Sequence, residues 1–213
     1  MVHTTTPDKP SAVRDPILMI KFDARIVVPG AVAAAASIAL VGGVAGWLGA
    51  GLALIMFAIA AVDARAFIIP DPLNAAGLVL GLLQAAVLAE EGVSSALAQA
   101  TLRSAVLALT FFLLRVFYFW LRGRQGIGLG DVKLAAVAGA WLDWTAIPVA
   151  IELAAVSALL AFAARHFVLR RPLRATSRLP FGLFLAPSIW VGWALQATVL
   201  QPYAWQPGVF YPY

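Results

Sequence analysis

The chain has no cysteine and only two histidines, His3 and His166, among its 213 residues. Without cysteine it can form no disulfide, no thiolate nucleophile and no cysteine-ligated zinc site. Two isolated histidines also cannot make a histidine-rich metal site. We therefore expect no metal site and no cofactor.

Charge is scarce as well. Charged residues make up 12% of the chain and hydrophobic residues 62%, whereas an ordinary soluble domain is roughly 25% charged and 45–50% apolar. The net charge of +5 does not indicate a nucleic-acid partner, because the basic residues flank apolar runs and form no patch interleaved with aromatics. The composition predicts an all-α, polytopic bundle of transmembrane helices in contact with a lipid bilayer.

Apolar runs separated by short polar connections extend over most of the chain. A bilayer core requires about 20 mainly apolar residues per helix, and the sequence provides about six to seven such spans. A break within 132–168 is predicted from Trp141, Asp143, Trp144 and Pro148. The predicted helices lie near 26–42, 46–63, 72–89, 96–121, two parts of 132–168, and 179–200.

Lysines and arginines fall in alternate connections, and the positive-inside rule places those connections in the cytoplasm. The opposite connections carry no lysine or arginine and contain Glu90, Glu91 and Asp143. We therefore predict a short cytoplasmic tail at 1–25, a membrane-embedded domain at 26–201, and a C-terminal tail at 202–213 on the non-cytoplasmic side. The basic residues are Lys9, Arg14, Lys21 and Arg25, then Arg65, then Arg122, Arg124 and Lys133, and finally Arg170, Arg171, Arg174 and Arg178.

Two of the predicted cytoplasmic connections place aspartates beside the hydrocarbon. VDARAFIIPD contains Asp63 and Asp71, and GIGLGD contains Asp131. Carboxylates at a membrane boundary are costly to draw inward, so ionisable residues there are candidates for function. The alternative is that they are interface charges next to Arg65 and Lys133.

The arrangement of Asp63 and Asp131 favours a catalytic pair. Asp63 is expected at the C-terminal end of the second helix and Asp131 at the N-terminal end of the fifth, so both can reach one site. One ionised and one protonated carboxyl group can activate water and stabilise an oxyanion. The helix dipoles favour an ionised Asp131 as the resting base and a protonated Asp63 as the acid.

The glycines before Asp131 suit an extended peptide lying against the loop. Gly126, Gly128 and Gly130 have no Cβ, so they can adopt positive φ and allow another backbone to approach closely. The alternative for Gly126 and Gly128 is a flexible turn. Lys133 either orients the site, binds lipid phosphate or is one more cytoplasmic anchor.

GLGDVKLA together with VDARAFIIPD resembles the prepilin peptidase family of membrane aspartyl proteases, whose hallmark is GxGD. Three further features make the resemblance specific to this family. They are Lys133 two residues after the aspartate, the spacing of eight residues from Asp63 to Asp71, and LPFGLFLA at 179–186. The resemblance implies that Asp63 and Asp131 are the catalytic pair. It implies supporting roles for Gly128, Gly130, Lys133, Asp71 and Pro70, and substrate-loop roles for Gly126, Phe181 and Gly182.

The resemblance also implies the substrate and the compartment. Prepilin peptidases remove the short basic leader from type IV prepilins or related pseudopilins, after a glycine, at the cytoplasmic face of the bacterial inner membrane. The implied partner is the hydrophobic helix of such a prepilin. The sequence does not distinguish type IV pilins from Flp-type pilins or secretion pseudopilins.

The chain departs from the family pattern at three points. Many bacterial members carry an insert with two CxxC pairs and methylate the new N-terminus, and this chain has neither the insert nor any cysteine. We therefore do not expect N-methyltransferase activity. The usual FGPFLA is FGLFLA here, with Leu183 in place of proline, and Pro72 directly follows IIPD.

Two other classes of function remain open from the sequence. A transporter or ion-coupled protein would place carboxylates near the bilayer midplane, whereas these are expected at helix ends. An inactive scaffold of the same fold is the second alternative. Away from the motifs, Arg103 and Glu152 are predicted to form an interhelical ion pair.

Overall fold

The computed structural model describes residues 24–90, 92–124, 126–167 and 180–200, and these residues form helices and connections with no strand. The predicted all-α fold is confirmed. The predicted tails at 1–25 and 202–213, apart from the start of the first helix, and the arginines of 170–178 lie outside the described residues. The helices are α1 (Ala24–Val41), α2 (Gly43–Ala66), α3 (Asp71–Val87), α4 (Val93–Arg122), α5 (Leu129–Trp141), α6 (Ala146–Phe167) and α7 (Gly182–Leu195), followed by a π-helical turn, η1 (Gln196–Leu200).

Four of these helical segments are long and apolar enough to cross a membrane: α2, α4, residues 146–164 of α6, and α7 continued by η1. Apolar segments of α1 and α3 are shorter, and α5 has 13 residues. The predicted division of 132–168 is confirmed, because α5 ends at Trp141 and α6 begins at Ala146. The carbonyl of Asp143 accepts the N–H groups of Ala146 and Ile147 in the intervening turn.

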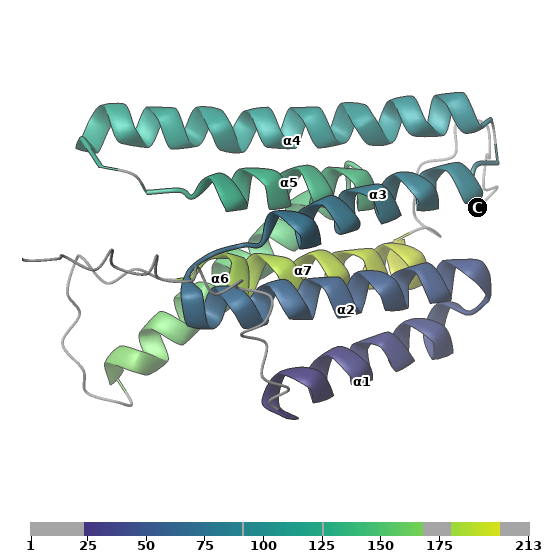
Figure 1. The fold of residues 1–213 in the computed structure, drawn as a ribbon, viewed down its shortest axis with the longest axis horizontal. Helices are drawn as coiled ribbons and strands as arrows, with labels where there is room; N and C mark the ends of the chain where they lie inside the picture. Colours follow the sequence, from purple (N-terminus) through teal and green to yellow (C-terminus); the bar gives the residue numbers. More distant parts are fainter. Residues whose placement is uncertain (1–23, 91, 125, 168–179, 201–213) are drawn as a thin grey trace, which may run out of the picture.

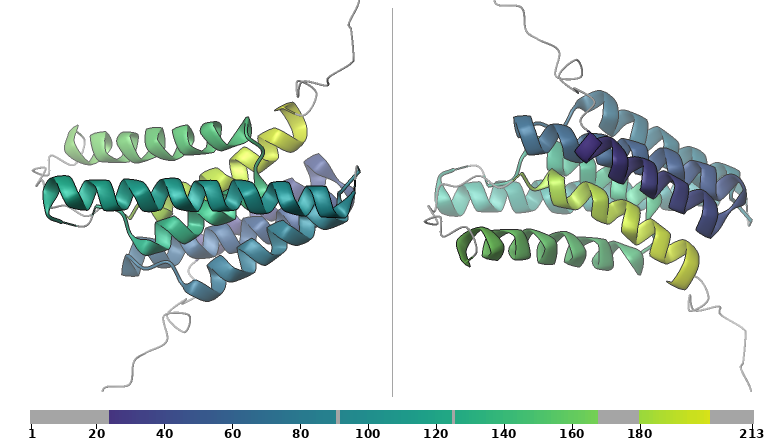
Figure 2. Two further views of the ribbon diagram at one scale, coloured as in Figure 1. Left: turned by 90° about the horizontal axis from the view of Figure 1, so that it is seen from above. Right: turned by 90° about the horizontal axis from the view of Figure 1, so that it is seen from below.

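The helices lie roughly along one common direction, with α4 at one edge of the bundle and α1 at the other (Figure 1). α2 packs against α1, α3 and α7, while α5 packs against α3, α4 and α7. α6 packs mainly on α7 and lies off to one side, as the two views of Figure 2 show. The helices α2, α3, α5 and α7 therefore form the centre of the protein.

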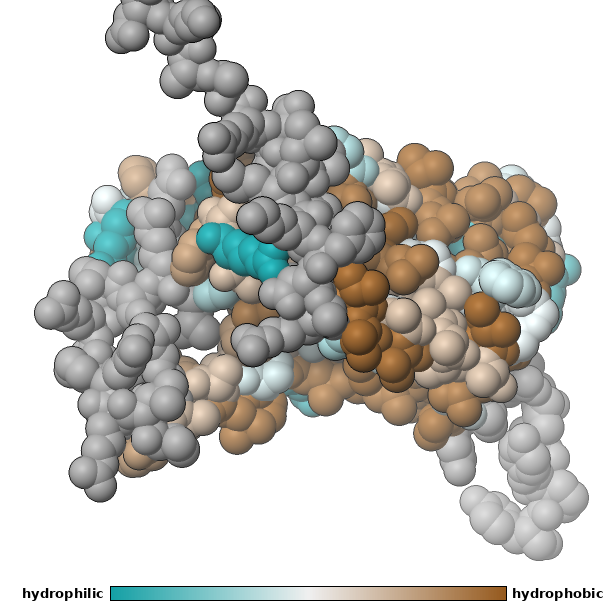
Figure 3. Space-filling model, turned by 60° about the horizontal axis from the view of Figure 1, so that its bottom comes forward, coloured by the Kyte–Doolittle hydropathy of each residue, from teal (hydrophilic) through white to brown (hydrophobic). Residues whose placement is uncertain are grey.

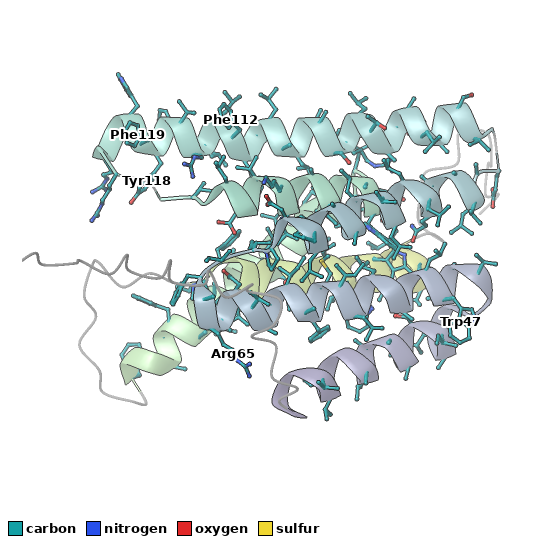
Figure 4. The ribbon with its side chains drawn as sticks, in the orientation of Figure 1. Trp47, Arg65, Phe112, Tyr118 and Phe119 are labelled. Atoms are coloured by element: carbon teal, nitrogen blue, oxygen red, sulfur yellow. The ribbon has the colours of Figure 1, made fainter. Side chains whose placement is uncertain are left out.

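The α2–α3 and α4–α5 connections lie at the same end of the bundle, and the α1–α2 and α3–α4 connections lie at the opposite end (Figure 1). Figure 4 shows Arg65, Tyr118 and Phe119 near the first end and Trp47 near the second. The predicted sidedness depends on this alternation, because it assumes that successive connections lie on opposite sides of the membrane. The orientation relative to a membrane stays a prediction.

Small residues bring the central helices close together. A Cβ on Gly139 of α5 would lie 2.5 Å from the backbone of Arg103 on α4. On the opposite side of α5, the indole N–H of Trp141 donates to the carbonyl of Gly77 on α3 at 2.8 Å. Close backbone approach through glycine is typical of helices packed inside membranes.

Arg103 has a different partner from the one predicted. Its guanidinium lies 3.9 Å from a carboxylate oxygen of Asp143 and donates to the carbonyl of Gly139 at 3.2 Å. The predicted pair with Glu152 is therefore wrong. The turn after α5 brings Asp143 back beside α4, and hydropathy does not reveal this approach.

The outer surface is largely apolar. On the face shown in Figure 3, hydrophobic residues cover much of the described surface. Large hydrophobic side chains are exposed along α4, including Phe112, Leu113, Phe117 and Trp120. A surface of this kind fits contact with lipid acyl chains.

Candidate active site

Asp63 lies in the last turn of α2, as predicted, and is only 5% exposed. Phe67 ends the helix in the left-handed conformation, with φ 54° and ψ 34°, and its N–H donates to the carbonyl of Asp63 at 3.0 Å. A bulky residue rarely adopts this conformation. The chain therefore turns sharply directly after Asp63 and brings Ile69 and Pro70 back toward the bundle.

The carboxylate of Asp63 is held by the start of α7. Its Oδ2 accepts the backbone N–H of Leu183 at 2.9 Å, and the backbone of Gly182 also interacts with it. A Cβ on Gly182 would lie 2.9 Å from the same oxygen. The absence of a side chain at Gly182 thus lets α7 approach the carboxylate with its first N–H groups.

Asp131 lies in the first turn of α5, and its Oδ2 accepts the N–H of Gly128 at 3.0 Å. Gly128 has φ −74° and ψ 155°, which is ordinary extended backbone. Gly130 is already helical and is not among the positive-φ glycines. Neither glycine uses the positive φ that the missing side chain permits, since the helix start itself fixes their conformation.

The helix ends that carry Asp63 and Asp131 are brought to the same end of the bundle. Asp63 lies in the last turn of α2 and Asp131 in the first turn of α5. The start of α5, with Gly130, and the start of α7, with Gly182, both pack against the side chain of Ile69, which is 8% exposed. A Cβ on Gly130 would lie 2.9 Å from Ile69 Cβ, and a Cβ on Gly182 would lie 2.7 Å from Ile69 Cδ1.

Ile69 was not identified from the sequence. It is the second isoleucine of IIPD, and its hydrophobicity does not distinguish it from the other apolar residues around it. The position directly before the Pro–Asp pair is the one signal that could have found it. The group that approaches Gly130 closely is the Ile69 side chain, and the approach of a substrate backbone stays a prediction.

Asp71 and Lys133 form an ion pair at the rim of the site. The Nζ of Lys133 lies 2.6 Å from Oδ1 of Asp71, and both side chains are largely exposed. Asp71 begins α3, Pro70 precedes it as the cap residue, and Pro72 occupies the first turn, where proline is tolerated. The two predicted supporting residues thus connect α3 to α5 beside the aspartates.

The remaining loop residues lie around the same end. A Cβ on Gly126 would lie 2.5 Å from the ring of Tyr118 on α4, and the carbonyl of Ile127 accepts the guanidinium of Arg115. Phe181 caps α7 and its carbonyl accepts the N–H groups of Phe184 and Leu185. These contacts fix the loop before Asp131 to α4 and the loop before α7 to its own first turn.

The geometry alters the argument about which aspartate is the acid. The C-terminal end of α2 would favour a protonated Asp63, but the start of α7 donates N–H groups to the same carboxylate. Both carboxylates therefore face the positive end of a helix. The helix dipoles do not separate the two roles, and the sequence could not show this because α7 follows Asp63 by more than 100 residues.

Within the described ranges there is no group of three or more histidine, cysteine, aspartate or glutamate side chains that could hold a metal ion. The chemistry that the site itself offers is that of two neighbouring carboxyl groups. One can accept a proton while the other donates one.

Comparisons with known proteins point to one family. The sequence model of the type IV leader peptidase family matches residues 50–163, which include Asp63, Asp71, Asp131 and Lys133. No solved structure matches the chain.

Curated relatives carry related names. A prepilin leader peptidase/N-methyltransferase of Burkholderia pseudomallei is 37% identical over 145 residues, which cover 64% of this chain and 42% of that protein. A protein of the same name from Aeromonas hydrophila is 30% identical over 148 residues, covering 66% of this chain and 46% of that protein. The leader peptidase HopD of Escherichia coli is 34% identical over 132 residues, covering 62% of this chain and 82% of that protein. The chain thus spans less than half the length of the first two relatives and most of the third.

Proposed function

Because the chain belongs to the type IV leader peptidase family, we propose that it is a membrane aspartic endopeptidase that removes the short basic leader of type IV prepilins or pseudopilins. Cleavage takes place at the cytoplasmic face of the bacterial inner membrane. The residues of 26–201 form the peptidase domain, and the prepilin helix lies in the bilayer beside it. N-methyltransferase activity is not part of the proposal.

The observation that carries the proposal is the meeting of Asp63 and Asp131 at one end of the bundle. They lie on two helices that are far apart in the sequence. Ile69 packs both on Gly130, which precedes Asp131, and on Gly182, which contacts Asp63. In the proposed mechanism the two carboxyl groups share one proton, because two ionised carboxylates in one site repel each other. Each carboxylate also has a backbone donor that fixes its position.

The reaction follows from these two groups. The ionised carboxylate takes a proton from water while the water oxygen attacks the carbonyl carbon of the scissile peptide bond. The protonated carboxyl group donates a hydrogen bond to the developing oxyanion, and a proton then passes to the leaving amine. No covalent intermediate forms, and neither a metal nor a cofactor takes part.

A transport function is less well supported by the geometry. Both carboxylates lie at helix starts or ends near one end of the bundle, whereas an ion pathway requires them near its middle.

Co-expression with a candidate prepilin tests the proposal. Leader removal shortens the prepilin, so it is followed as a shift on a denaturing gel, and mass spectrometry of the product locates the cut. The matched control is the same prepilin expressed without the peptidase. If type IV prepilins, Flp-type prepilins and pseudopilins all remain uncut, the proposal is wrong.

A further inference from the structure

Asn74, on α3, is buried without a partner for its amide. The residue is 4% exposed, and among the described residues neither its Nδ2 nor its Oδ1 has a hydrogen-bond partner. A buried amide that makes no hydrogen bond is destabilising. Polar groups that remain in this state often serve a site and are satisfied by an ordered water.

The contacts of α3 place Asn74 against α5. Gly81 lies two helical turns further along the same face, and a Cβ there would lie 2.7 Å from the ring of Trp141. At the beginning of α3, Ile69 packs on Gly130. The two helices therefore run in the same direction, and Asn74 lies opposite residues 133 and 134 of α5.

This position is about one helical turn deeper in the bundle than Asp131, or roughly 5 Å along the axis. The Cα–Cβ bond of a helical residue leans toward the N-terminus of its helix. Because α3 starts at the end of the bundle that carries the aspartates, the amide of Asn74 leans toward Asp131. A buried amide of this kind can be satisfied by an ordered water with two to four polar partners, and the carboxylate one turn above it is the polar group that would share such a water.

We propose that Asn74 is a positioning residue of the aspartate pair, whose amide holds a water molecule that hydrogen-bonds to the carboxylate of Asp131. The inference rests on the proposed function in one respect, namely that the pair is catalytic. The water fixes the orientation of Asp131 and stabilises its ionised form, because hydrogen bonds to a carboxylate favour the charge.

Other charged groups surround this end of the bundle and remain the same in the variants described below. Asp63 faces the pair from α2, and Asp71 and Lys133 neutralise each other at the rim. Arg115 of α4 binds the carbonyl of Ile127.

The test replaces Asn74 by leucine, which keeps the branched shape of the side chain and has no polar atoms. The matched control is Gln84→Leu, which removes an amide with a buried, unpartnered oxygen near the other end of the same helix. We expect Asn74→Leu to lower kcat for prepilin cleavage about tenfold with little change in KM, and Gln84→Leu to leave both near the wild-type values. Should the leucine variant fail to accumulate in membranes, Asn74→Ala removes the amide without adding volume and must show the same loss.

A second measurement does not depend on cleavage. Carbodiimide with an amine nucleophile labels protonated carboxyl groups, and peptide mass spectrometry gives the extent of labelling at Asp131 as a function of pH. We expect Asn74→Leu to increase labelling of Asp131 about three- to tenfold at a given pH, which corresponds to a shift of half to one pH unit. Absence of cleavage by the wild-type protein would contradict the proposed function alone. An unchanged labelling profile in Asn74→Leu, or an equal change in Gln84→Leu, would overturn the role of Asn74.

Discussion

The backbone N–H of Leu183 donates to Oδ2 of Asp63 at 2.9 Å across 120 residues of sequence. This bond connects α7 to one member of the aspartate pair. In the family pattern that the sequence resembles, proline is usual at this position, and proline has no N–H to donate. The departure at Leu183 therefore gives this chain a donor to Asp63 that the usual pattern lacks.

Replacing Leu183 by proline removes that one donor. The position is the second residue of α7, where proline is tolerated, so we expect the fold and cleavage to persist. A backbone N–H favours the ionised carboxylate, and its loss makes protonation easier. We therefore expect the acidic limb of the pH–rate profile to move to higher pH.

Leu183→Ala is the matched control, because it changes the side chain and keeps the N–H. Its acidic limb should coincide with that of the wild-type protein. Identical profiles for the proline and alanine variants would show that the bond to Asp63 has no influence on its ionisation.

Gly182 should not tolerate a side chain. A Cβ there would lie 2.7 Å from Ile69 Cδ1 and 2.9 Å from Asp63 Oδ2, so Gly182→Ala must push α7 away from the carboxylate. We expect cleavage to fall at least tenfold, since a small displacement of a catalytic group has an effect of this size. Initial rates on a fixed amount of membrane-inserted protein provide the measurement.

Two further variants identify the cause. Ile69→Val removes Cδ1, so it should restore part of the activity when combined with Gly182→Ala. Gly51→Ala is the control away from the site, because its Cβ would meet only the flexible end of Leu80 at 2.8 Å. Equal losses in Gly51→Ala and Gly182→Ala would contradict a specific effect on Asp63.

The ion pair between Lys133 and Asp71 should make a modest contribution. Both side chains are largely exposed, and exposed pairs are coupled by roughly 0.2–1 kcal/mol. We expect Lys133→Met and Asp71→Asn each to lower cleavage by a few fold, and the double variant to lose less than the two losses combined. The measurement is a double-mutant cycle at low and high salt, since screening weakens an exposed pair. Fully independent effects of the two substitutions would show that the pair does not position α3 against α5.

The sequence was sufficient for the features that depend on local pattern. Hydropathy located seven helices, the interruption at Asp143 separated α5 from α6, and the motifs around Asp63 and Asp131 indicated the candidate site. The helix bounds shifted by a few residues, because helix ends depend on caps such as Phe67, whose left-handed conformation no propensity predicts.

The features that the sequence did not reveal all depend on packing between distant helices. The donor at Leu183 depends on how α7 meets α2, and the partner of Arg103 depends on how the turn after α5 returns to α4. The position of Ile69 between two glycines follows from the sharp turn after α2. Periodicity shows which face of a helix is apolar, but it does not show which helix covers that face.

The central claim is that Asp63 and Asp131 act together as the catalytic pair, and the most direct test removes each charge without changing the shape of the side chain. Cleavage of a co-expressed prepilin is measured for Asp63→Asn, Asp131→Asn and the double variant, at equal amounts of protein in the membrane, with Asp71→Asn as the control carboxylate at the rim. We expect each single variant to abolish leader removal as completely as the double variant, because neither carboxyl group can replace the other, while Asp71→Asn retains cleavage. Leader removal that persists in Asp63→Asn or in Asp131→Asn would contradict the account.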